Sequence, residues 1–346
     1  MQRREFIAAV GAVAATALSR SGPIYAQPIG GVAHRTVLAN GIHLHFAEQG
    51  EGPLVVLCHG FPESWYSWRH QIPALSAAGF HVVAVDMRGY GQSDRPEAID
   101  QYTLLHLVGD MVELLDALGV EQAVIAGHDW GAPVAWHAAL LRPDRFRAVI
   151  ALSVPFRSRS VVFFNPSAAP PTSVMPHRDD AIFYQLYFQT PGVAEAELER
   201  DVRQTFLKLL ANPPSDRPAI PWVPRDGSWL TRKPTAAPLP TWLTEADIDF
   251  YASEFKRTGF RGALNWYRNI DRNWELLAPF AGAKVTVPAL YMTGDRQQDI
   301  DQVIAALEKD VPRLRRAIVL RDCGHWAQQE RPSEVNAAMI DFLRQL

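Results

Sequence analysis

The amino-acid sequence predicts an α/β protein with a mostly parallel, eight-stranded sheet, helices on both faces of the sheet and an inserted helical cap. Three observations lead to this fold class. Six short apolar runs have no polar face, which is typical of parallel strands that helices cover on both sides. Helical patterns alternate with these runs. A long stretch without such a strand then interrupts the alternation, and this stretch predicts the cap.

The sheet is expected to begin with an antiparallel hairpin. Asn40 and Gly41 lie between two alternating segments of residues 35–48, and an Asn-Gly pair in that position favours a two-residue turn. The expected parallel strands are residues 54–58, 81–86, 123–127, 148–154, 287–294 and 317–320. The helical patterns cover residues 67–78, 103–118, the segment after Asp129, and 300–310. Because strand and helix alternate, the six runs are predicted to share one sheet.

The long interruption divides the chain into regions. Residues 157–283 combine helical patterns with a proline-rich stretch. A structureless loop of that length is rare inside a compact domain, so we interpret 157–283 as a helical cap over the carboxyl edge of the sheet. The predicted organisation is an export signal at 1–26, a core of 27–156 and 284–346, and this cap.

The first residues have the pattern of an export signal. Arg3 and Arg4 precede a weakly apolar run of about 13 residues, and cleavage is expected after Ala26. A run of this length is too short to span a bilayer, so no stable membrane anchor is expected. We interpret the pattern as a twin-arginine signal, with an ordinary secretory signal as the alternative. The mature chain is therefore expected in the periplasm.

The stretch VIAGHDWGAPVAWHAALL, residues 124–141, predicts a sharp turn from a strand into a helix. Asp129 stands where one class of such turns holds a nucleophilic serine, with Gly127 and Gly131 on either side. A carboxylate is already anionic near neutral pH, so it attacks saturated carbon without a base to activate it. The resulting ester contains the carbonyl of Asp129, which an activated water can hydrolyse. Asp129 is therefore the predicted nucleophile.

Other candidate residues follow predicted strands at the same edge of the sheet, where such sheets bind ligands. His325 follows the last expected strand, and its position after the nucleophile in the chain suits the base that activates the water. Hydrolysis of the ester passes through a negative tetrahedral intermediate. We expect the backbone N–H groups of Phe61 and Trp130 to stabilise this intermediate.

Five motifs carry a resemblance that covers nearly the whole chain after the signal: HGFPESWYSWRHQ, GHDWG, FYQLYFQTPGVAEAELE, GFRGALNWYRNIDRNW and DCGHW. With these motifs the sequence resembles the epoxide hydrolases of the α/β-hydrolase fold, especially the hydrolase domain of the mammalian soluble enzyme and its bacterial relatives. The resemblance implies this fold with its cap, conversion of an epoxide to a vicinal diol, and no metal or organic cofactor. It also implies that Tyr184 and Tyr267 reach from the cap to the epoxide oxygen, a role that suits phenols because they donate hydrogen bonds.

One position departs from the family pattern. The acid that orients the histidine is expected three residues after Gly294, and Gln297 stands there. Asp295 and Asp299 flank Gln297 by two residues each, and the strand that ends near Ser153 offers no acid. We take Asp299 as the orienting acid, with Asp295 as the alternative.

Other functions stay open at this point. A haloalkane dehalogenase shares an aspartate nucleophile followed by a tryptophan, although it gives no reason for both tyrosines. A catalytically weak binding protein on the same fold is suggested by Gln297. A serine esterase is excluded because the sequence has no Gly-x-Ser-x-Gly. The net charge of −3 gives no electrostatic reason to expect nucleic acid as a partner. The resemblance implies a small apolar epoxide and water as partners, and a homodimer stays open.

Overall fold

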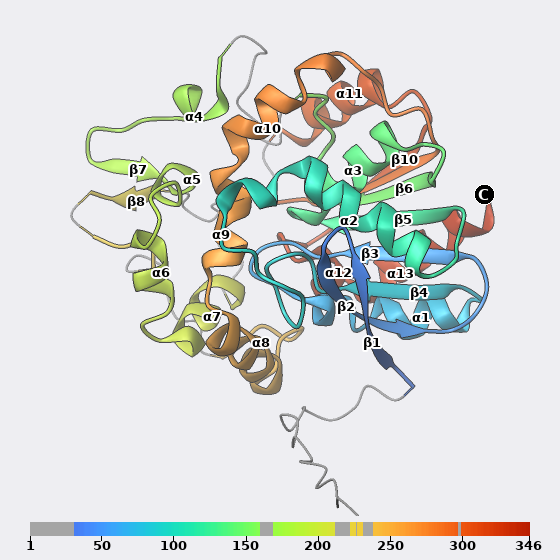
Figure 1. The fold of residues 1–346 in the computed structure, drawn as a ribbon, viewed down its shortest axis with the longest axis horizontal. Helices are drawn as coiled ribbons and strands as arrows, with labels where there is room; N and C mark the ends of the chain where they lie inside the picture. Colours follow the sequence, from blue (N-terminus) through green and yellow to red (C-terminus); the bar gives the residue numbers. More distant parts are fainter. Residues whose placement is uncertain (1–30, 160–168, 212–221, 226, 231–237, 297–298) are drawn as a thin grey trace, which may run out of the picture.

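The computed structural model describes residues 31–159, 169–211, 222–225, 227–230, 238–296 and 299–346. Its strands are β1 (Ala33–Ala39), β2 (Ile42–Gln49), β3 (Leu54–Cys58), β4 (His81–Val85), β5 (Ala123–His128), β6 (Phe146–Leu152), β9 (Ala289–Gly294) and β10 (Leu314–Leu320). They form one sheet in the order β1-β2-β4-β3-β5-β6-β9-β10 (Figure 1). β2 pairs antiparallel with β1 and β4, and all other neighbours are parallel. The predicted eight-stranded, mostly parallel sheet is confirmed.

The predicted hairpin is present. Ala39 pairs with Ile42 across a two-residue turn, so β1 and β2 meet at Asn40 and Gly41. Both turn residues have positive φ, 49° for Asn40 and 76° for Gly41. This backbone conformation costs asparagine and glycine less than other residues, which is why the pair specifies the turn.

Helices cover the sheet. They are α1 (Gln71–Ala77), α2 (Leu104–Ala117), α3 (Gly131–Leu141), α11 (Ile300–Asp310), α12 (Ala327–Glu330) and α13 (Pro332–Arg344), with 3₁₀ turns η1 (Trp65–Trp68) and η2 (Ile99–Tyr102). α1 packs with α13 and α2 packs with α3. Every residue of β3 and β5 is buried. This burial on both faces explains why these strands are continuous apolar runs in the sequence.

The prediction of one helix over residues 67–78 is wrong for its first residues. The structure has η1 and then α1, which begins at Gln71. Pro73 explains the break, because a helix that began at residue 67 would place this proline in its interior. Proline has no N–H to donate there, whereas it is tolerated in the first turn.

Between β6 and β9 the chain forms the elements of the cap. These are α4 (Pro171–Val174), α5 (Tyr184–Tyr187), α6 (Val193–Leu198), α7 (Val202–Leu210), α8 (Glu245–Thr258), α9 (Arg261–Arg268), α10 (Ile270–Leu276) and η3 (Ala278–Phe280), together with strands β7 (Ala181–Phe183) and β8 (Trp222–Pro224). The antiparallel β7–β8 pair was not expected in a helical cap. Each of its strands has three residues, too few to show an alternating pattern. The cap bounds of 157 and 283 stay a prediction.

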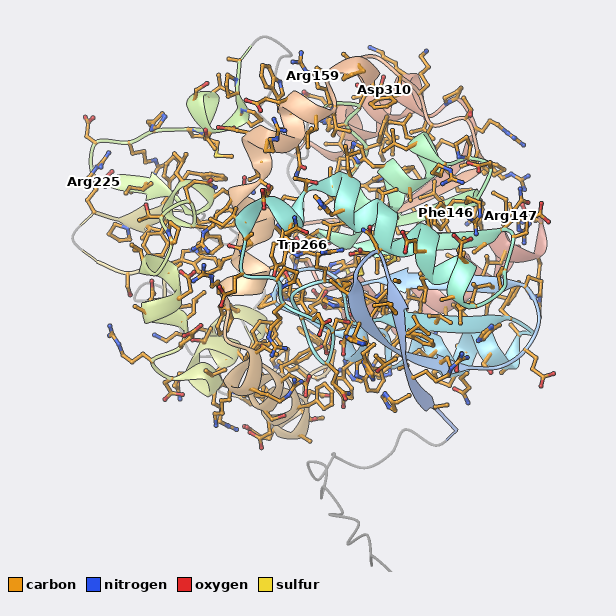
Figure 2. The ribbon with its side chains drawn as sticks, in the orientation of Figure 1. Phe146, Arg147, Arg159, Arg225, Trp266 and Asp310 are labelled. Atoms are coloured by element: carbon orange, nitrogen blue, oxygen red, sulfur yellow. The ribbon has the colours of Figure 1, made fainter. Side chains whose placement is uncertain are left out.

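The cap lies beside one edge of the sheet. In Figure 2, Trp266 of α9 lies between the cap and the sheet, whereas Phe146, the first residue of β6, lies towards the other end. The indole N–H of Trp266 donates to the carbonyl oxygen of Arg88 (3.0 Å). On a second side, Arg69 of the core forms an ion pair with Asp247 of α8 (3.1 Å). These contacts fix the cap over the carboxyl ends of the parallel strands, where the predicted site lies.

The predicted export signal, residues 1–26, lies outside the described residues, so export stays a prediction. Among the residues that the structure does describe, none of the helices has the length and apolar character needed to cross a membrane.

A buried ion pair joins the loop after β4 to α2, and the hairpin turn binds to the same pair. Arg88 donates through Nε and Nη2 to the two carboxylate oxygens of Asp110 (2.8 and 2.5 Å), and both side chains are almost fully buried. The side chain of Asn40 also donates to Asp110 (2.8 Å). Removal of one partner of such a pair leaves a buried charge without compensation.

We therefore predict that Asp110→Ala lowers the free energy of unfolding by about 3–5 kcal/mol, measured by urea denaturation. Asp144→Ala is the matched control, because Asp144 forms an exposed ion pair with Arg142 (2.6 Å). Exposed pairs contribute less than about 1 kcal/mol. Equal losses in the two variants would contradict the role assigned to the buried pair.

Candidate active site

Close backbone packing creates the turn that presents Asp129. Asp129 has a φ of 49°, which is uncommon for a residue with a side chain. The glycines on either side have no room for a Cβ atom: at Gly127 it would lie 2.0 Å from the carbonyl oxygen of Gly131, and at Gly131 it would lie 2.1 Å from that of Cys58. The turn from β5 into α3 therefore requires both glycines, as the functional interpretation of the motif expects.

The two carboxylate oxygens of Asp129 have different partners. Oδ1 accepts a hydrogen bond from the backbone N–H of Phe61 (2.8 Å), and Oδ2 lies 3.3 Å from Nε2 of His325. Phe61 reaches Asp129 because β3 and β5 are neighbours in the sheet, with Cys58 paired to Gly127. The structure thus brings together Asp129, His325 and Phe61. Trp130 directly follows the nucleophile at the start of α3, and the role of its N–H group stays a prediction.

The surroundings of Asp129 favour its charged form. Burial acts to raise its pKa, but the hydrogen bond and charge of His325, the charge of His128 and the N–H of Phe61 together lower it. A pKa below the usual range keeps the carboxylate anionic at neutral pH. Asp129 is therefore ready to act as a nucleophile without a base.

A second charged pair lies beneath the site. His128 is fully buried, and its Nδ1 donates to Glu63 (2.9 Å) while its Nε2 donates to the carbonyl oxygen of His325 (2.8 Å). A carboxylate and a carbonyl only accept hydrogen bonds, so both ring nitrogens carry protons and the ring is positive. Burial acts to lower the pKa of His128, but Glu63 raises it more. Neither residue has a predicted chemical role from the sequence, where the Glu of HGFPESW is an acidic residue within a motif rich in aromatic residues.

Glu63 is itself fixed by two glutamines. Its Oε1 accepts hydrogen bonds from the side chains of Gln328 (3.1 Å) and Gln329 (2.8 Å), which lie on α12 just after His325. Buried charges need such donors, because the protein replaces the water that they lose. The buried pair therefore also joins the loop after β3 to the segment after His325.

The loop that carries His325 is held by its backbone. The carbonyl oxygen of His325 accepts from Ser153 Oγ as well as from His128 (both 2.8 Å). Glu330 accepts from the N–H groups on either side of His325, those of Gly324 (2.7 Å) and Trp326 (2.8 Å). The ring itself is 42% exposed. The structure therefore fixes the main chain of His325 and leaves its ring accessible to water.

The structure does not bring the predicted orienting acid to His325. Asp299 is exposed at the start of α11 with a φ of 56°, and no hydrogen bond joins it to His325 in the described part of the chain. Asp295 accepts instead from the N–H groups of Asp322 (2.9 Å) and Cys323 (3.2 Å), which steadies the loop before His325. Gln297 lies outside the described residues. Asp299 stays a prediction without a supporting contact.

The two predicted tyrosines meet above the nucleophile. Tyr184 begins α5 and Tyr267 lies on α9, and their ring centroids are 6.1 Å apart. The ring of Tyr267 also packs edge-on against Trp130 (5.1 Å) and Phe61 (5.4 Å). Burial raises the pKa of both tyrosines, and the charge of Asp129 raises them further. Both phenols are therefore protonated at neutral pH, as hydrogen-bond donors must be.

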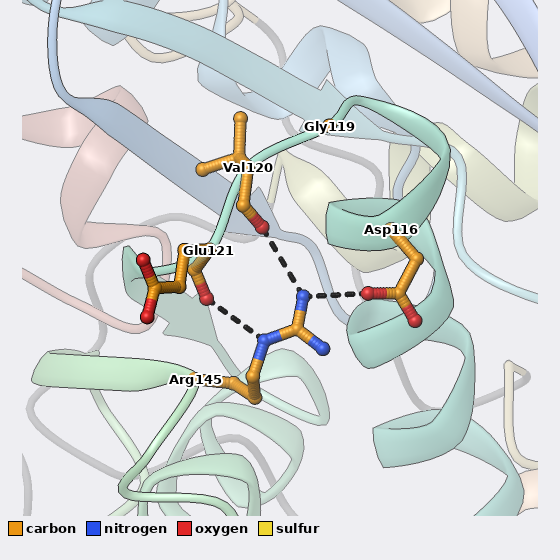
Figure 3. Close-up of a pocket in the computed structure, with 5 residues that line it drawn as sticks. All are labelled: Asp116, Gly119, Val120, Glu121 and Arg145. Atoms are coloured by element: carbon orange, nitrogen blue, oxygen red, sulfur yellow. Dashed lines mark hydrogen bonds and ion pairs between the residues drawn. The ribbon is translucent and has the colours of Figure 1, made fainter.

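A hollow of about 480 Å³ lies beside the start of β6 (Figure 3). It is lined by Asp116, Gly119, Val120, Glu121 and Arg145. Arg145 directly precedes β6, which places the hollow at the amino ends of the strands. Its guanidinium group is bound by Asp116 (2.8 Å) and by the carbonyl oxygens of Val120 (3.1 Å) and Glu121 (2.8 Å). Neither Asp129 nor His325 lines this hollow, so the predicted site lies elsewhere.

Comparisons with known proteins agree with this geometry. Residues 53–332 match the family model of the alpha/beta hydrolase fold. The chain is 46% identical to epoxide hydrolase A of Mycobacterium tuberculosis over 91% of this chain and 98% of that protein. It is 44% identical to bifunctional epoxide hydrolase 2 of Sus scrofa over 90% of this chain, which corresponds to 55% of the longer pig protein.

A solved structure gives the same result. The crystal structure of epoxide hydrolase A from Mycobacterium thermoresistibile matches with a TM-score of 0.84 and 48% identity, over 90% of this chain and 98% of that one. Similarity of this extent in sequence and structure, together with the aspartate at the turn, means that the chain belongs to the epoxide hydrolases of the alpha/beta hydrolase fold.

Proposed function

We propose that the chain converts an epoxide and water to a vicinal diol through a covalent ester on Asp129. The observation that carries this proposal is the pair of differently bound oxygens on the Asp129 carboxylate, one held by Phe61 and the other facing His325. Both protonated tyrosines lie close to this carboxylate, whose charge raises their pKa values. The arrangement provides a nucleophile, proton donors and a base.

In the first half-reaction, Oδ2 of Asp129 attacks an epoxide carbon. The C–O bond of the epoxide breaks, and its electron pair stays on the departing oxygen. Tyr184 and Tyr267 donate to that oxygen, which would otherwise be a poor leaving group. Oδ1 remains bound to the N–H of Phe61 and becomes the carbonyl oxygen of the ester.

In the second half-reaction, His325 takes a proton from a water that attacks the ester carbonyl. Negative charge then develops on Oδ1, where the N–H of Phe61 already points (2.8 Å). A preorganised donor at that atom stabilises the tetrahedral intermediate. Its collapse breaks the C–O bond to the substrate, and the departing oxygen takes the proton held by His325 as the diol leaves. The proton that remains on Asp129 returns to the tyrosine that donated in the first half-reaction, which restores the carboxylate.

A haloalkane dehalogenase would use the same nucleophile and base. A halide leaves without a proton, so that reaction gives no reason for two tyrosines that burial keeps protonated near Asp129. Turnover of a fluorogenic epoxide, with no halide release from a panel of haloalkanes, is the test that separates the two activities.

We predict that a single turnover in ¹⁸O-labelled water puts the label into the carboxylate of Asp129 and leaves the first diol unlabelled. The reason is that the oxygen transferred to the substrate comes from Asp129, and water replaces it afterwards. Mass spectrometry of the diol and of the peptide that contains Asp129 measures both. Label in the first diol would mean that water attacks the epoxide directly.

We predict that Tyr184→Phe and Tyr267→Phe each slow ester formation. In the double variant the rate of ester formation is expected to fall about 10²–10⁴-fold, which is the usual contribution of a general acid. Rapid mixing under single-turnover conditions measures this step. Tyr291→Phe is the matched control, because Tyr291 is a buried tyrosine whose hydroxyl donates to the backbone of Ser153 (3.0 Å). Normal ester formation in the double variant would place the proton donor elsewhere.

Within the described residues no acid contacts Nδ1 of His325, and a further prediction follows from this. In the resting site Nε2 of His325 faces the Asp129 carboxylate and donates to it, but as a base Nε2 must be unprotonated. An acid beside Nδ1 would favour the tautomer that carries its proton on Nδ1 and leaves Nε2 free. In serine proteases, replacement of that acid by its amide lowers turnover about 10⁴-fold. We therefore expect ester hydrolysis to be the slow step.

Gln297→Asp is expected to speed this step at least about tenfold, seen as less trapped ester in the intact mass at steady state. Asp295→Asn and Asp299→Asn are the comparison variants, and we expect little change in either. A trapped ester that appears only in Asp299→Asn would instead identify Asp299 as the orienting acid.

A further inference from the structure

The hydroxyl of Tyr184 has a hydrogen-bond donor beside it. Nε2 of Gln185 lies 3.0 Å from the phenol oxygen and donates to it. A phenol oxygen has one proton and two lone pairs. Because Gln185 occupies a lone pair, the proton of Tyr184 is not used in this contact and is available to another acceptor.

The surrounding cap residues keep this contact in place. Nε2 of Gln189 donates to the carbonyl oxygens of both Gln185 (2.8 Å) and Tyr267 (3.0 Å), so one side chain joins the two segments that carry the tyrosines. The ring of Tyr184 stacks on Trp229, with centroids 5.6 Å apart and planes within 8°. Neither the ring nor its backbone is free to turn away from the site.

The N–H of Gln185 also acts on the charge of the phenol. Burial raises the pKa of Tyr184, and the hydrogen bond from Gln185 acts in the opposite direction because it stabilises the phenolate. A donor to the oxygen of an acid strengthens that acid as its proton leaves. Tyr267 also has such a partner, because a hydrogen bond with the side chain of Trp130 acts to lower its pKa, and its ring packs against those of Phe188, Trp130 and Phe61.

We propose that Gln185 is a positioning residue that keeps the proton of Tyr184 directed to the epoxide oxygen and stabilises the phenolate that remains. This inference rests on the proposed function and gives Tyr184 a partner that assists its proton transfer. As the epoxide C–O bond breaks, its electron pair stays on the oxygen and takes the proton of Tyr184, and Gln185 donates to the phenolate that remains. The proton released when water hydrolyses the ester of Asp129 restores the phenol, so the cycle balances.

The test compares two variants of Gln185 in single-turnover rapid mixing, with formation and hydrolysis of the ester measured separately. Gln185→Met keeps the length of the side chain but has no N–H, and Gln185→Glu keeps its shape but presents an acceptor. We expect ester formation to slow about tenfold in the Met variant and more in the Glu variant, with ester hydrolysis unchanged. Gln204→Met, at an exposed glutamine of α7, is the matched control and keeps both rates.

A double-mutant cycle separates positioning from general packing. In the Tyr184→Phe background, Gln185→Met is expected to have no further effect on ester formation, because its partner hydroxyl is gone. In the Tyr267→Phe background the same change keeps its tenfold effect. Thermal unfolding of each variant checks that the cap remains folded, and Gln185→Glu serves if the Met variant does not fold.

Three outcomes would overturn the proposal. Equal slowing by Gln185→Met with and without Tyr184 would mean that Gln185 acts through something else. Equal slowing of ester formation and hydrolysis would mean a general structural role. Faster ester formation in Gln185→Met would mean that the amide accepts from Tyr184 and withholds its proton. Failure of the proposed function looks different, because the unmodified chain would then form no ester on Asp129.

Discussion

The site depends on how closely three stretches of backbone approach one another at the carboxyl end of β5. No Cβ atom fits at Gly127 or Gly131, and at Gly60 it would lie 2.4 Å from the side chain of Asp129. This packing holds the backbone of Asp129 at a positive φ, which residues with a side chain rarely adopt. It also brings the N–H of Phe61 to one carboxylate oxygen. A larger residue at any of the three glycines would move the nucleophile away from its hydrogen-bond donor before any chemistry could occur.

The charges around the site follow from the same burial. A buried carboxylate is costly unless partners compensate it, and Asp129 has the N–H of Phe61, the ring of His325 and the nearby positive charge of His128. His128 needs its own counter-charge, which Glu63 provides at 2.9 Å. Removal of Glu63 would therefore disturb two hydrogen bonds, the one from His128 to Glu63 and the one from His128 to the carbonyl oxygen of His325.

The sequence predicted the parts of this protein that follow from local patterns. Parallel strands buried on both faces are apolar runs, and the turn at Asp129 needs glycines at fixed spacing, so both were found. The short β7–β8 pair was missed, since three residues give no periodicity. The roles of Ser153 and His128 were missed because each acts on the carbonyl oxygen of His325, a contact that depends on the folded chain. Asp299 was chosen because a small shift of the loop would bring it to the position of Gln297, and sequence position alone does not determine where the side chain lies.

The cap leaves the sheet after β6 and returns at β9, and these two strands are direct neighbours, with Val149 paired to Ala289. Because β6 and β9 are parallel, the chain leaves at the carboxyl end of β6 and must run back along the sheet to the amino end of β9, so the insertion does not interrupt the pairing of the two strands. The core carries Asp129 and His325, which make and hydrolyse an ester whatever group departs, whereas the cap carries Tyr184 and Tyr267. The fold thus separates two tasks: the core provides the groups that make and hydrolyse the ester, and the cap provides the groups that face the departing oxygen. A different insertion would present different groups to the departing atom, while Asp129 and His325 kept their places in the core.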